Sequence, residues 1–341
     1  MDSKKLIIGI DVSADTFTWT PYDATNKTYG SAMTFPNTPE GFENLTQWVI
    51  QQGYTPEQTL ICLENTGVYN HTLCYWLATR KFTLAVEPPQ KVKRAFFETF
   101  KKTDELDSRQ IAEYAVRFFD CLTFWSAPQE LIEHLQAFLS TREQLSKQSV
   151  MNRNILHMLQ RKYVRTLIAE KSLELVIENL KEEIKKIEKE INALIKKDST
   201  FAPIHALLTS IPGVGTLLSA NMILMTNGFK DGADPRKLSS HLGIAPHPRR
   251  SGSSVNKRPR SRGYGSDRLR GLLYLASLSL RTHQELFRKY FLRKVDAGKN
   301  KRLVLNNIAN KLIRVICAVV NSRTPFIDNF MSVNPMILKN S

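Results

Sequence analysis

The chain has 341 residues, 42% of them hydrophobic, and this length suits two or three packed domains. Its formal net charge of +16 favours binding to a polyanion, and nucleic acid is the commonest such partner. Other classes are disfavoured, since we find no run of ~18 apolar residues for a membrane span, no His/Cys spacing for a zinc site and no signal peptide before the first strand. The four cysteines are far apart in apolar contexts, as expected of buried thiols in a reducing cytoplasm.

Residues 1–125 predict an α/β domain. Stretches rich in β-formers at 6–12, 16–20 and 31–35 precede an amphipathic segment that begins at Pro39. A strand at 59–64, a helix at about 68–81 and a strand at 83–86 follow. Three strands in a meander and then strand–helix alternation is the order of a ribonuclease-H-like domain, although many α/β folds share parts of it.

Residues 126–200 predict a helical region. Its last helix carries apolar residues spaced 3-4-3-4-3, namely Ile177, Leu180, Ile184, Ile187, Ile191 and Leu194. This seam fits either an internal hairpin against residues 131–159 or a coiled coil that forms a dimer. The pattern is too short to separate the two.

Residues 201–325 predict a mainly helical C-terminal domain, followed by a tail at 326–341. The run Ile211-Pro212-Gly213-Val214-Gly215-Thr216 between two helices is the pattern of a helix-hairpin-helix module. Glycines there let backbone amides approach a DNA phosphate at a helix N-terminus, or simply permit a tight turn. The motif lacks the Gly-Lys-Ser/Thr ending of a nucleotide-binding phosphate loop.

The most cationic segment surrounds a cluster of small hydroxyl residues that begins at Ser251. Between Arg236 and Arg270 there are ten Lys or Arg and one acid, so a phosphate backbone is the expected partner. A serine among arginines beside a phosphodiester is a candidate nucleophile, because guanidinium groups stabilise the developing charge. A solvated loop that merely touches DNA is the alternative. The expected nucleic-acid contacts are Gly213, Gly215, Arg249, Arg250, Lys257, Arg258, Arg260, Arg262 and Arg268.

Four acids follow the order strand, strand, helix pair. Asp11 ends the first strand and Glu64 ends a later one, so adjacent strands would place both carboxylates at one sheet edge. Asp104 and Asp107 are three residues apart at the start of a helix, which aims both at one face. Taken alone, this pair would serve equally well to cap the helix and complement its dipole. Converging carboxylates repel each other, and hard divalent cations relieve that repulsion. Two Mg²⁺ ions about 4 Å apart would then activate a phosphodiester.

The sequence resembles bacterial insertion-sequence transposases of the DEDD type, relatives of the Piv DNA invertase that are described as bridge-RNA-guided recombinases. The blocks that carry this resemblance occur in family order over nearly the whole chain. They are Ile8-Gly9-Ile10-Asp11-Val12-Ser13, Leu63-Glu64-Asn65-Thr66-Gly67-Val68-Tyr69, Lys102-Thr103-Asp104-Glu105-Leu106-Asp107-Ser108-Arg109, Ser210-Ile211-Pro212-Gly213-Val214-Gly215, Leu242-Gly243-Ile244-Ala245-Pro246, Ser251-Gly252-Ser253-Ser254-Val255, Arg262-Gly263 and Arg268-Leu269-Arg270.

The resemblance implies a RuvC-like N-terminal domain, a helical linker and a C-terminal transposase domain. It implies that Asp11, Glu64, Asp104 and Asp107 bind the metal and that Ser251 attacks DNA to form a phosphoserine link. It also implies that the acids and the serine meet across protomers of a dimer or tetramer, and that a structured noncoding RNA pairs with the DNA. Asn65 departs from the smaller residue of many relatives, which puts the immediate surroundings of Glu64 in doubt.

Three other functions stay open on the residues alone. A metal-dependent nuclease or Holliday-junction resolvase would use water at the acids. A site-specific DNA invertase would exchange strands to invert a DNA segment. A non-catalytic nucleic-acid-binding protein would need only the basic surface. Each would act on double-stranded DNA in the cytoplasm, at the nucleoid, and not at a membrane.

Overall fold

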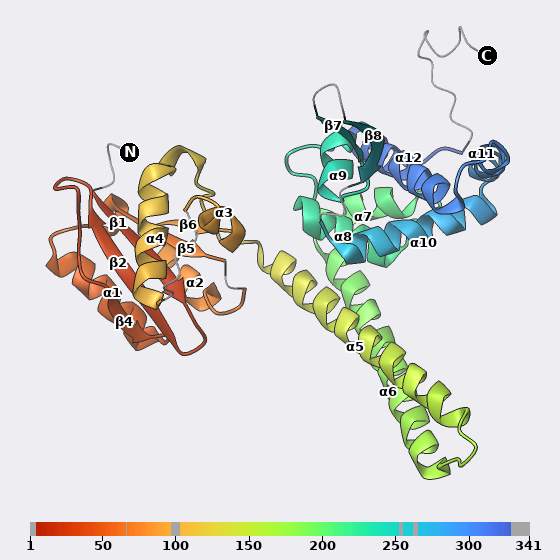
Figure 1. The fold of residues 1–341 in the computed structure, drawn as a ribbon, viewed down its shortest axis with the longest axis horizontal. Helices are drawn as coiled ribbons and strands as arrows, with labels where there is room; N and C mark the ends of the chain where they lie inside the picture. Colours follow the sequence, from red (N-terminus) through yellow and green to blue (C-terminus); the bar gives the residue numbers. More distant parts are fainter. Residues whose placement is uncertain (1–4, 66, 97–102, 252–254, 262–264, 329–341) are drawn as a thin grey trace, which may run out of the picture. The chain divides into compact units, whose positions relative to one another are not determined.

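The structure is a computed structural model that describes residues 5–65, 67–96, 103–251, 255–261 and 265–328, with the backbone alone at 248–251 and 255–260. The chain forms two compact units, Met1–Pro128 and Gln129–Ser341 (Figure 1). The helical region at 126–200, which the sequence sets apart as a segment of its own, belongs to the second unit.

The first unit is a mixed β-sheet with helices on both faces. Its elements are β1 (Leu6–Val12), β2 (Thr16–Asp23), β3 (Thr28–Tyr29), β4 (Met33–Pro36), α1 (Pro39–Gln51), η1 (Pro56–Gln58), β5 (Thr59–Glu64), α2 (His71–Thr79), β6 (Thr83–Glu87), α3 (Pro89–Lys93), α4 (Asp104–Arg117) and η2 (Phe119–Cys121).

The strand order is β3-β2-β1-β5-β6, with β4 also paired to β2. Strands β1 and β2 are antiparallel, whereas β1, β5 and β6 run parallel. An antiparallel meander joined to parallel strands through helices confirms the predicted ribonuclease-H-like arrangement. The predicted third strand at 31–35 corresponds to β4, and the short β3 before it was not expected.

Strand β1 is buried on both faces, and its alternate residues pack against different helices. Ile8 and Ile10 face a core shared with α1 and α2, while Ile7 faces a second core beneath α4. Gly9 lies directly under α4, where a Cβ atom would overlap the carbonyl oxygen of Ser108 and the backbone of Ala112. A glycine is therefore required for α4 to approach the sheet this closely.

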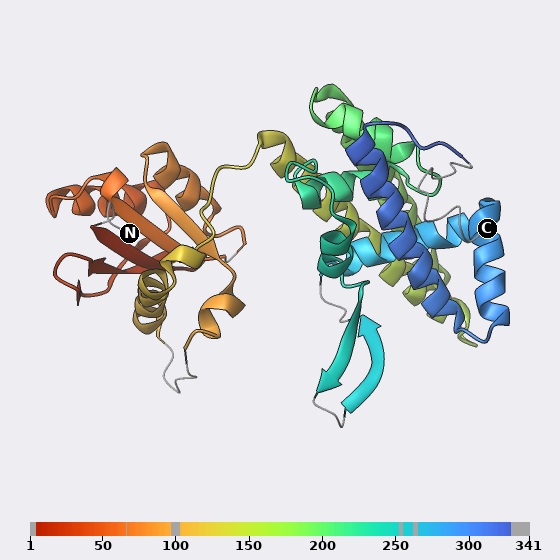
Figure 2. The ribbon, with the colours of Figure 1, turned by 90° about the horizontal axis from the view of Figure 1, so that it is seen from above.

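The second unit is mostly helical and carries one β-hairpin that extends from the helices (Figure 2). Its elements are α5 (Glu130–Gln160), α6 (Leu167–Lys197), α7 (Phe201–Thr209), α8 (Thr216–Thr226), α9 (Pro235–His241), β7 (Pro246–Ser251), β8 (Val255–Ser261), α10 (Asp267–His283), α11 (Glu285–Asp296) and α12 (Lys301–Ser322).

Helices α5 and α6 form a long antiparallel hairpin within one chain (Figure 1). Ile177, Ile191 and Ile195 of α6 are buried, and Arg142 of α5 donates from Nε to Glu188 of α6 at 2.9 Å. Ile177 and Ile191 of the seam predicted on α6 are thus buried within one chain, while a coiled coil that forms a dimer stays a prediction.

Among the described residues, α12 is long and apolar enough to cross a membrane by length and composition. Half of its most apolar stretch is buried inside the unit, and Val304, Ile308, Leu312 and Ile316 belong to the main core. This burial is what the central helix of a packed domain shows. Lys311 and Arg314 interrupt this helix, so the sequence shows no unbroken apolar run of that length.

Candidate active site

The carboxyl edge of the sheet in the first unit brings two predicted acids to neighbouring positions. Glu64 is the last residue of β5, and Asp11 is the next residue after Ile10, which pairs with Leu63 in the parallel register. Asp11 lies on the same strand face as Ile7 and Gly9, and Glu64 on the same face as Cys62. Both carboxylates therefore project on the side of the sheet that α4 covers.

Helix α4 brings the other two acids toward this edge. Ser108 is fixed beside Gly9 by a buried hydrogen bond to Thr20 Oγ1, at 2.8 Å. Later in the helix, the charges of Glu113 and Arg117 act on Tyr29, which lies level with Ile7 near the amino end of β1. The helix thus runs from the carboxyl edge toward the amino edge (Figure 1).

The first turn of α4, with Asp104 and Asp107, therefore lies toward the edge that carries Asp11 and Glu64. Thr103 caps the helix, because its hydroxyl accepts from the Leu106 amide at 3.3 Å. Neither aspartate is needed as the N-cap, although both complement the helix dipole.

Carboxylate oxygens are the donors that a hard divalent cation prefers, so the residue types at this edge fit Mg²⁺. Within the described ranges, no three His, Cys, Asp or Glu side chains lie close enough together to hold a metal ion. The backbone collects the donors on one side of the sheet, but their side chains do not form a closed group.

Two asparagines that the sequence analysis did not single out hold the loops of this edge. Asn37 donates from Nδ2 to Ser13 O at 2.9 Å and to Tyr69 O at 3.0 Å, so it joins the turn after Asp11 to the loop after Glu64. Asn70, which is buried, donates to Glu64 O at 3.1 Å. Asparagine is common in turns, and no sequence signal distinguished these two from the others.

A further strand-end acid, Glu87, is buried beneath its own ion pair. Glu87 ends β6 opposite Glu64, and its carboxylate accepts from Lys91 Nζ at 2.8 Å and from the Thr123 amide at 2.6 Å. The hydrogen bond to Glu87 raises the pKa of Lys91. Glu87 is thus charge-compensated within the fold. The Glu-x-x-x-Lys spacing at the start of α3 was the available signal for this pair.

Ser251 is the last residue of β7, at the outer end of the β-hairpin in the second unit (Figure 2). The hairpin register pairs Arg249 with Lys257 and Ser251 with Val255. The predicted contacts Arg249, Arg250, Lys257, Arg258 and Arg260 lie along its two strands, where the structure describes backbone only, and Arg262 lies outside the described residues.

The two glycines of the predicted helix-hairpin-helix turn have different surroundings. Gly213 has a φ of +80°, and a Cβ there would lie 3.1 Å from the carbonyl oxygen of Ala276. Gly213 therefore lies in a tight turn that packs against α10. Gly215 is the N-cap of α8 and a Cβ there would meet nothing within 4 Å, so the N-terminus of α8 is open at that position.

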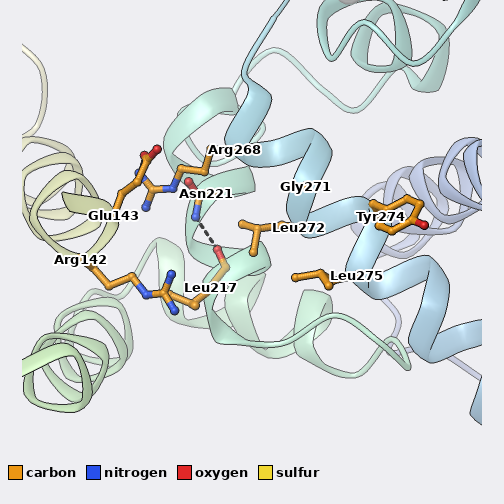
Figure 3. A pocket seen from close by; sticks show the side chains of 9 residues that line it. All are labelled: Arg142, Glu143, Leu217, Asn221, Arg268, Gly271, Leu272, Tyr274 and Leu275. Carbon is orange, nitrogen blue, oxygen red and sulfur yellow. Dashed lines mark hydrogen bonds and ion pairs between the residues drawn. The ribbon is translucent and has the colours of Figure 1, made fainter. Parts of the chain in front are cut away.

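Arg268 lines a pocket of about 400 Å³ between α5, α8 and α10 (Figure 3). Its guanidinium lies 3.4 Å from the Glu143 carboxylate, and burial lowers the pKa of Arg268. Asn221, also in this pocket, donates to Leu217 O at 2.7 Å. The predicted nucleic-acid contact Arg268 is thus already paired within the second unit and 19% exposed.

Two family models match the chain. A transposase model of the DEDD IS110 type matches residues 8–164, and a model of the IS116/IS110/IS902 transposase family matches residues 205–292. The first ends between α5 and α6, and the second spans the helix-hairpin-helix turn and the β-hairpin.

The chain is 24% identical over 329 residues to the pilin gene-inverting protein of Moraxella lacunata, covering 94% of this chain and 98% of that protein. A second relative is an uncharacterized 44.8 kDa protein of insertion element IS116 from Streptomyces clavuligerus, 28% identical over 147 residues, 43% of this chain and 36% of that protein. Among solved structures, the RuvC of T. thermophilus in complex with a Holliday junction substrate aligns with a TM-score of 0.25 and 10% identity, over 35% of this chain and 99% of that chain.

Proposed function

Because the chain belongs to the IS116/IS110/IS902 family of transposases, we propose that it cleaves and exchanges DNA strands through a covalent bond between DNA and Ser251. The observation that carries this proposal is the placement of Asp11 and Glu64 on adjacent strand ends, with the acidic first turn of α4 toward the same edge. That placement gathers the donors for phosphoryl-transfer chemistry at one side of the sheet.

In the proposed first step, Ser251 Oγ attacks the phosphorus of a DNA phosphodiester. A Ser–O–P bond forms, the bond from phosphorus to the leaving deoxyribose oxygen breaks, and the serine proton is lost while the leaving oxygen gains one. In the second step a free DNA hydroxyl attacks the phosphoserine and releases the serine. One phosphodiester is exchanged for another, so no ATP is needed.

Serine is a weak nucleophile at neutral pH and requires activation. Asp11, Glu64, Asp104 and Asp107 are the residues that would hold divalent cations, which we take to be two Mg²⁺. The ions would supply Lewis-acid stabilisation of the phosphoryl oxygens. The basic positions of the β-hairpin, Arg249, Arg250, Lys257, Arg258 and Arg260, would orient the backbone phosphates around Ser251.

The acidic edge belongs to the first unit and Ser251 to the second. We propose that the two meet across protomers of a homodimer, or of a tetramer that holds the element ends and the target DNA together. We further propose that a structured RNA selects the DNA by base pairing while the protein recognises shape and backbone, as in other RNA-guided systems. The protein would act in the cytoplasm, at the nucleoid.

Covalent trapping tests the serine. Incubation with nicked element-end DNA and Mg²⁺ is expected to give protein–DNA adducts that survive denaturation. Ser251→Ala should abolish them, and Ser253→Ala, two residues further along the chain, should retain them. Adducts that persist undiminished in Ser251→Ala would disprove this role.

Two alternatives have specific support. The placement of the acids in one unit and of Ser251 in the other favours metal-dependent hydrolysis, in which water attacks. Cleavage would then survive Ser251→Ala and disappear in Asp11→Asn. The similarity to pilin gene-inverting proteins over nearly the whole chain favours site-specific inversion. Inversion of a segment between two sites, measured in cells on a reporter, distinguishes it from insertion at a new site.

A further inference from the structure

The loop that follows Glu64 presents two neighbouring apolar side chains to solvent. Val68 is 79% exposed and Tyr69 is 48% exposed. Single exposed apolar residues are ordinary on protein surfaces, but an adjacent pair beside a candidate catalytic edge is informative. The question is which ligand covers this pair.

Hydrogen bonds hold this loop against the sheet on both sides of the pair. The Gly67 amide donates to Asn65 Oδ1 at 3.2 Å, and Asn70 Nδ2 donates to Glu64 O at 3.1 Å. Asn37 Nδ2 donates to the carbonyl oxygen of Tyr69 itself at 3.0 Å. The backbone that carries Val68 and Tyr69 is thus tied directly to the end of β5, and these side chains are displayed from a defined turn.

We propose that Val68 and Tyr69 insert into the base stack of the DNA, next to the phosphodiester that reaches the acidic edge. This inference rests on the proposed function, since it takes the acidic edge as the place where DNA is cleaved. A phosphodiester at Asp11 and Glu64 brings its own bases to the loop that begins at the next residue. Stacked bases offer apolar faces that fit an aliphatic wedge and an aromatic ring.

The inserted pair has a function in strand exchange. Apolar wedges between base steps unstack the duplex and bend it. Unstacking beside the scissile phosphate frees the strand to approach the carboxylates and later to leave its partner strand. Val68 would open the step, and the Tyr69 ring would cover the face of the exposed base.

Permanganate footprinting tests the wedge, because permanganate oxidises thymines that have lost stacking. Full-length protein, assembled with RNA transcribed from its own element, is bound to double-stranded element-end DNA in Ca²⁺, which replaces Mg²⁺ to suppress cleavage. Wild type should expose thymines beside the cleavage position. In the double variant Val68→Ser/Tyr69→Ser, the permanganate reactivity of these thymines should fall roughly tenfold. The affinity for DNA should change by about threefold or less, because phosphate contacts dominate affinity.

The matched control is Ile50→Ser. Ile50 is 58% exposed on α1, and its replacement should leave the footprint and the cleavage rate unchanged. In Mg²⁺, the double variant should cleave fully paired DNA about tenfold more slowly. DNA with mismatches at the pairs that flank the cleavage position is already unstacked, and it should restore cleavage by the double variant close to wild type.

Two results would overturn the wedge. One is an unchanged thymine footprint in the double variant. The other is slow cleavage that mismatched DNA does not rescue, which would make the loop a support for Glu64 or a contact for a protein partner. Failure of the proposed function would be recognised separately. If wild type forms no adduct at Ser251, the thymine footprints of wild type and the double variant in Ca²⁺ can still be compared.

Discussion

The hydroxyl groups of Thr20 and Ser108 lie 2.8 Å apart in a buried hydrogen bond that joins β2 to α4. Thr20 is paired with Gly9, and a Cβ at Gly9 would overlap the backbone of α4. The Thr20–Ser108 hydrogen bond and the absence of a side chain at Gly9 therefore determine how α4 packs on the sheet. The position of Asp104 and Asp107 relative to Asp11 depends on both.

Gly9→Ala is expected to displace α4 and destabilise the first unit by about 3 kcal/mol. The added methyl group would overlap backbone atoms of α4, which cannot move aside as a flexible side chain could. All four tryptophans, Trp19, Trp48, Trp76 and Trp125, lie in the first unit, so tryptophan fluorescence in urea reports on it. Gly271→Ala in α10 is the control, since a Cβ there meets nothing within 4 Å. It should stabilise the second unit by about 0.5 kcal/mol, followed by far-UV circular dichroism. Equal stability of Gly9→Ala and wild type would contradict the close packing.

Asn37→Ala is expected to slow DNA cleavage about tenfold with only about 1 kcal/mol lost in stability, because it frees the loops after Asp11 and Glu64 from each other. Asn26→Ala removes a side-chain hydrogen bond to Asp23 in the same unit and serves as the control. Cleavage rates at saturating DNA and urea unfolding are the measurements. A loss of cleavage matched in Asn26→Ala would show that the effect is not specific to the edge.

The second unit is expected to lose stability in mild acid through His205. His205 is buried, its Nδ1 lies 2.8 Å from Ser219 Oγ, and burial, with the charge of Lys196 as a smaller cause, lowers its pKa. The folded state therefore favours the neutral ring. Its contribution to stability is fully present above the unfolded pKa of about 6.5 and is lost as pH falls through the lower folded pKa.

The contribution of His205 to the slope of the unfolding free energy against pH cannot exceed about 1.4 kcal/mol per pH unit. Unfolding of wild type and His205→Asn by urea between pH 5 and 8, followed by circular dichroism, measures it, and the variant should show a flatter dependence below pH 6.5. Parallel curves for the two proteins would exclude His205 as the titrating group.

Arg268→Ala is expected to leave the salt dependence of DNA binding unchanged, because Glu143 already neutralises its guanidinium inside the second unit. Arg249→Ala on the β-hairpin should reduce the slope of log affinity against log salt by about 0.9, the value for one phosphate contact. Fluorescence anisotropy with duplex DNA at several salt concentrations separates the two. A reduced slope for Arg268→Ala would mean that the arginine leaves Glu143 to bind phosphate.

Local sequence patterns predicted most of the first unit and the residues of its edge. The apolar, β-rich run at 6–12 identified β1, and Asp11 and Glu64 were found because each lies at the end of a buried strand. Strand and helix periods arise from neighbours a few residues apart, so the amino-acid order alone carries them. In the second unit the sequence predicted a helical region and a mainly helical domain, but it treated the residues of β7 and β8 as a basic loop.

Only the tertiary structure shows which segments that are distant in the sequence contact each other. The seam of α6 was compatible with α5 and with another chain, and the structure shows α5 packed against α6. Arg268 was predicted as a phosphate contact from its charge alone, and the structure shows Glu143 beside it. Asn37 and the difference between Gly213 and Gly215 carried no local signal. An apolar seam can pack against many apolar surfaces, and a single charge can pair with many opposite charges, with similar interaction energies. The partner found in the folded protein depends on the packing of the whole chain.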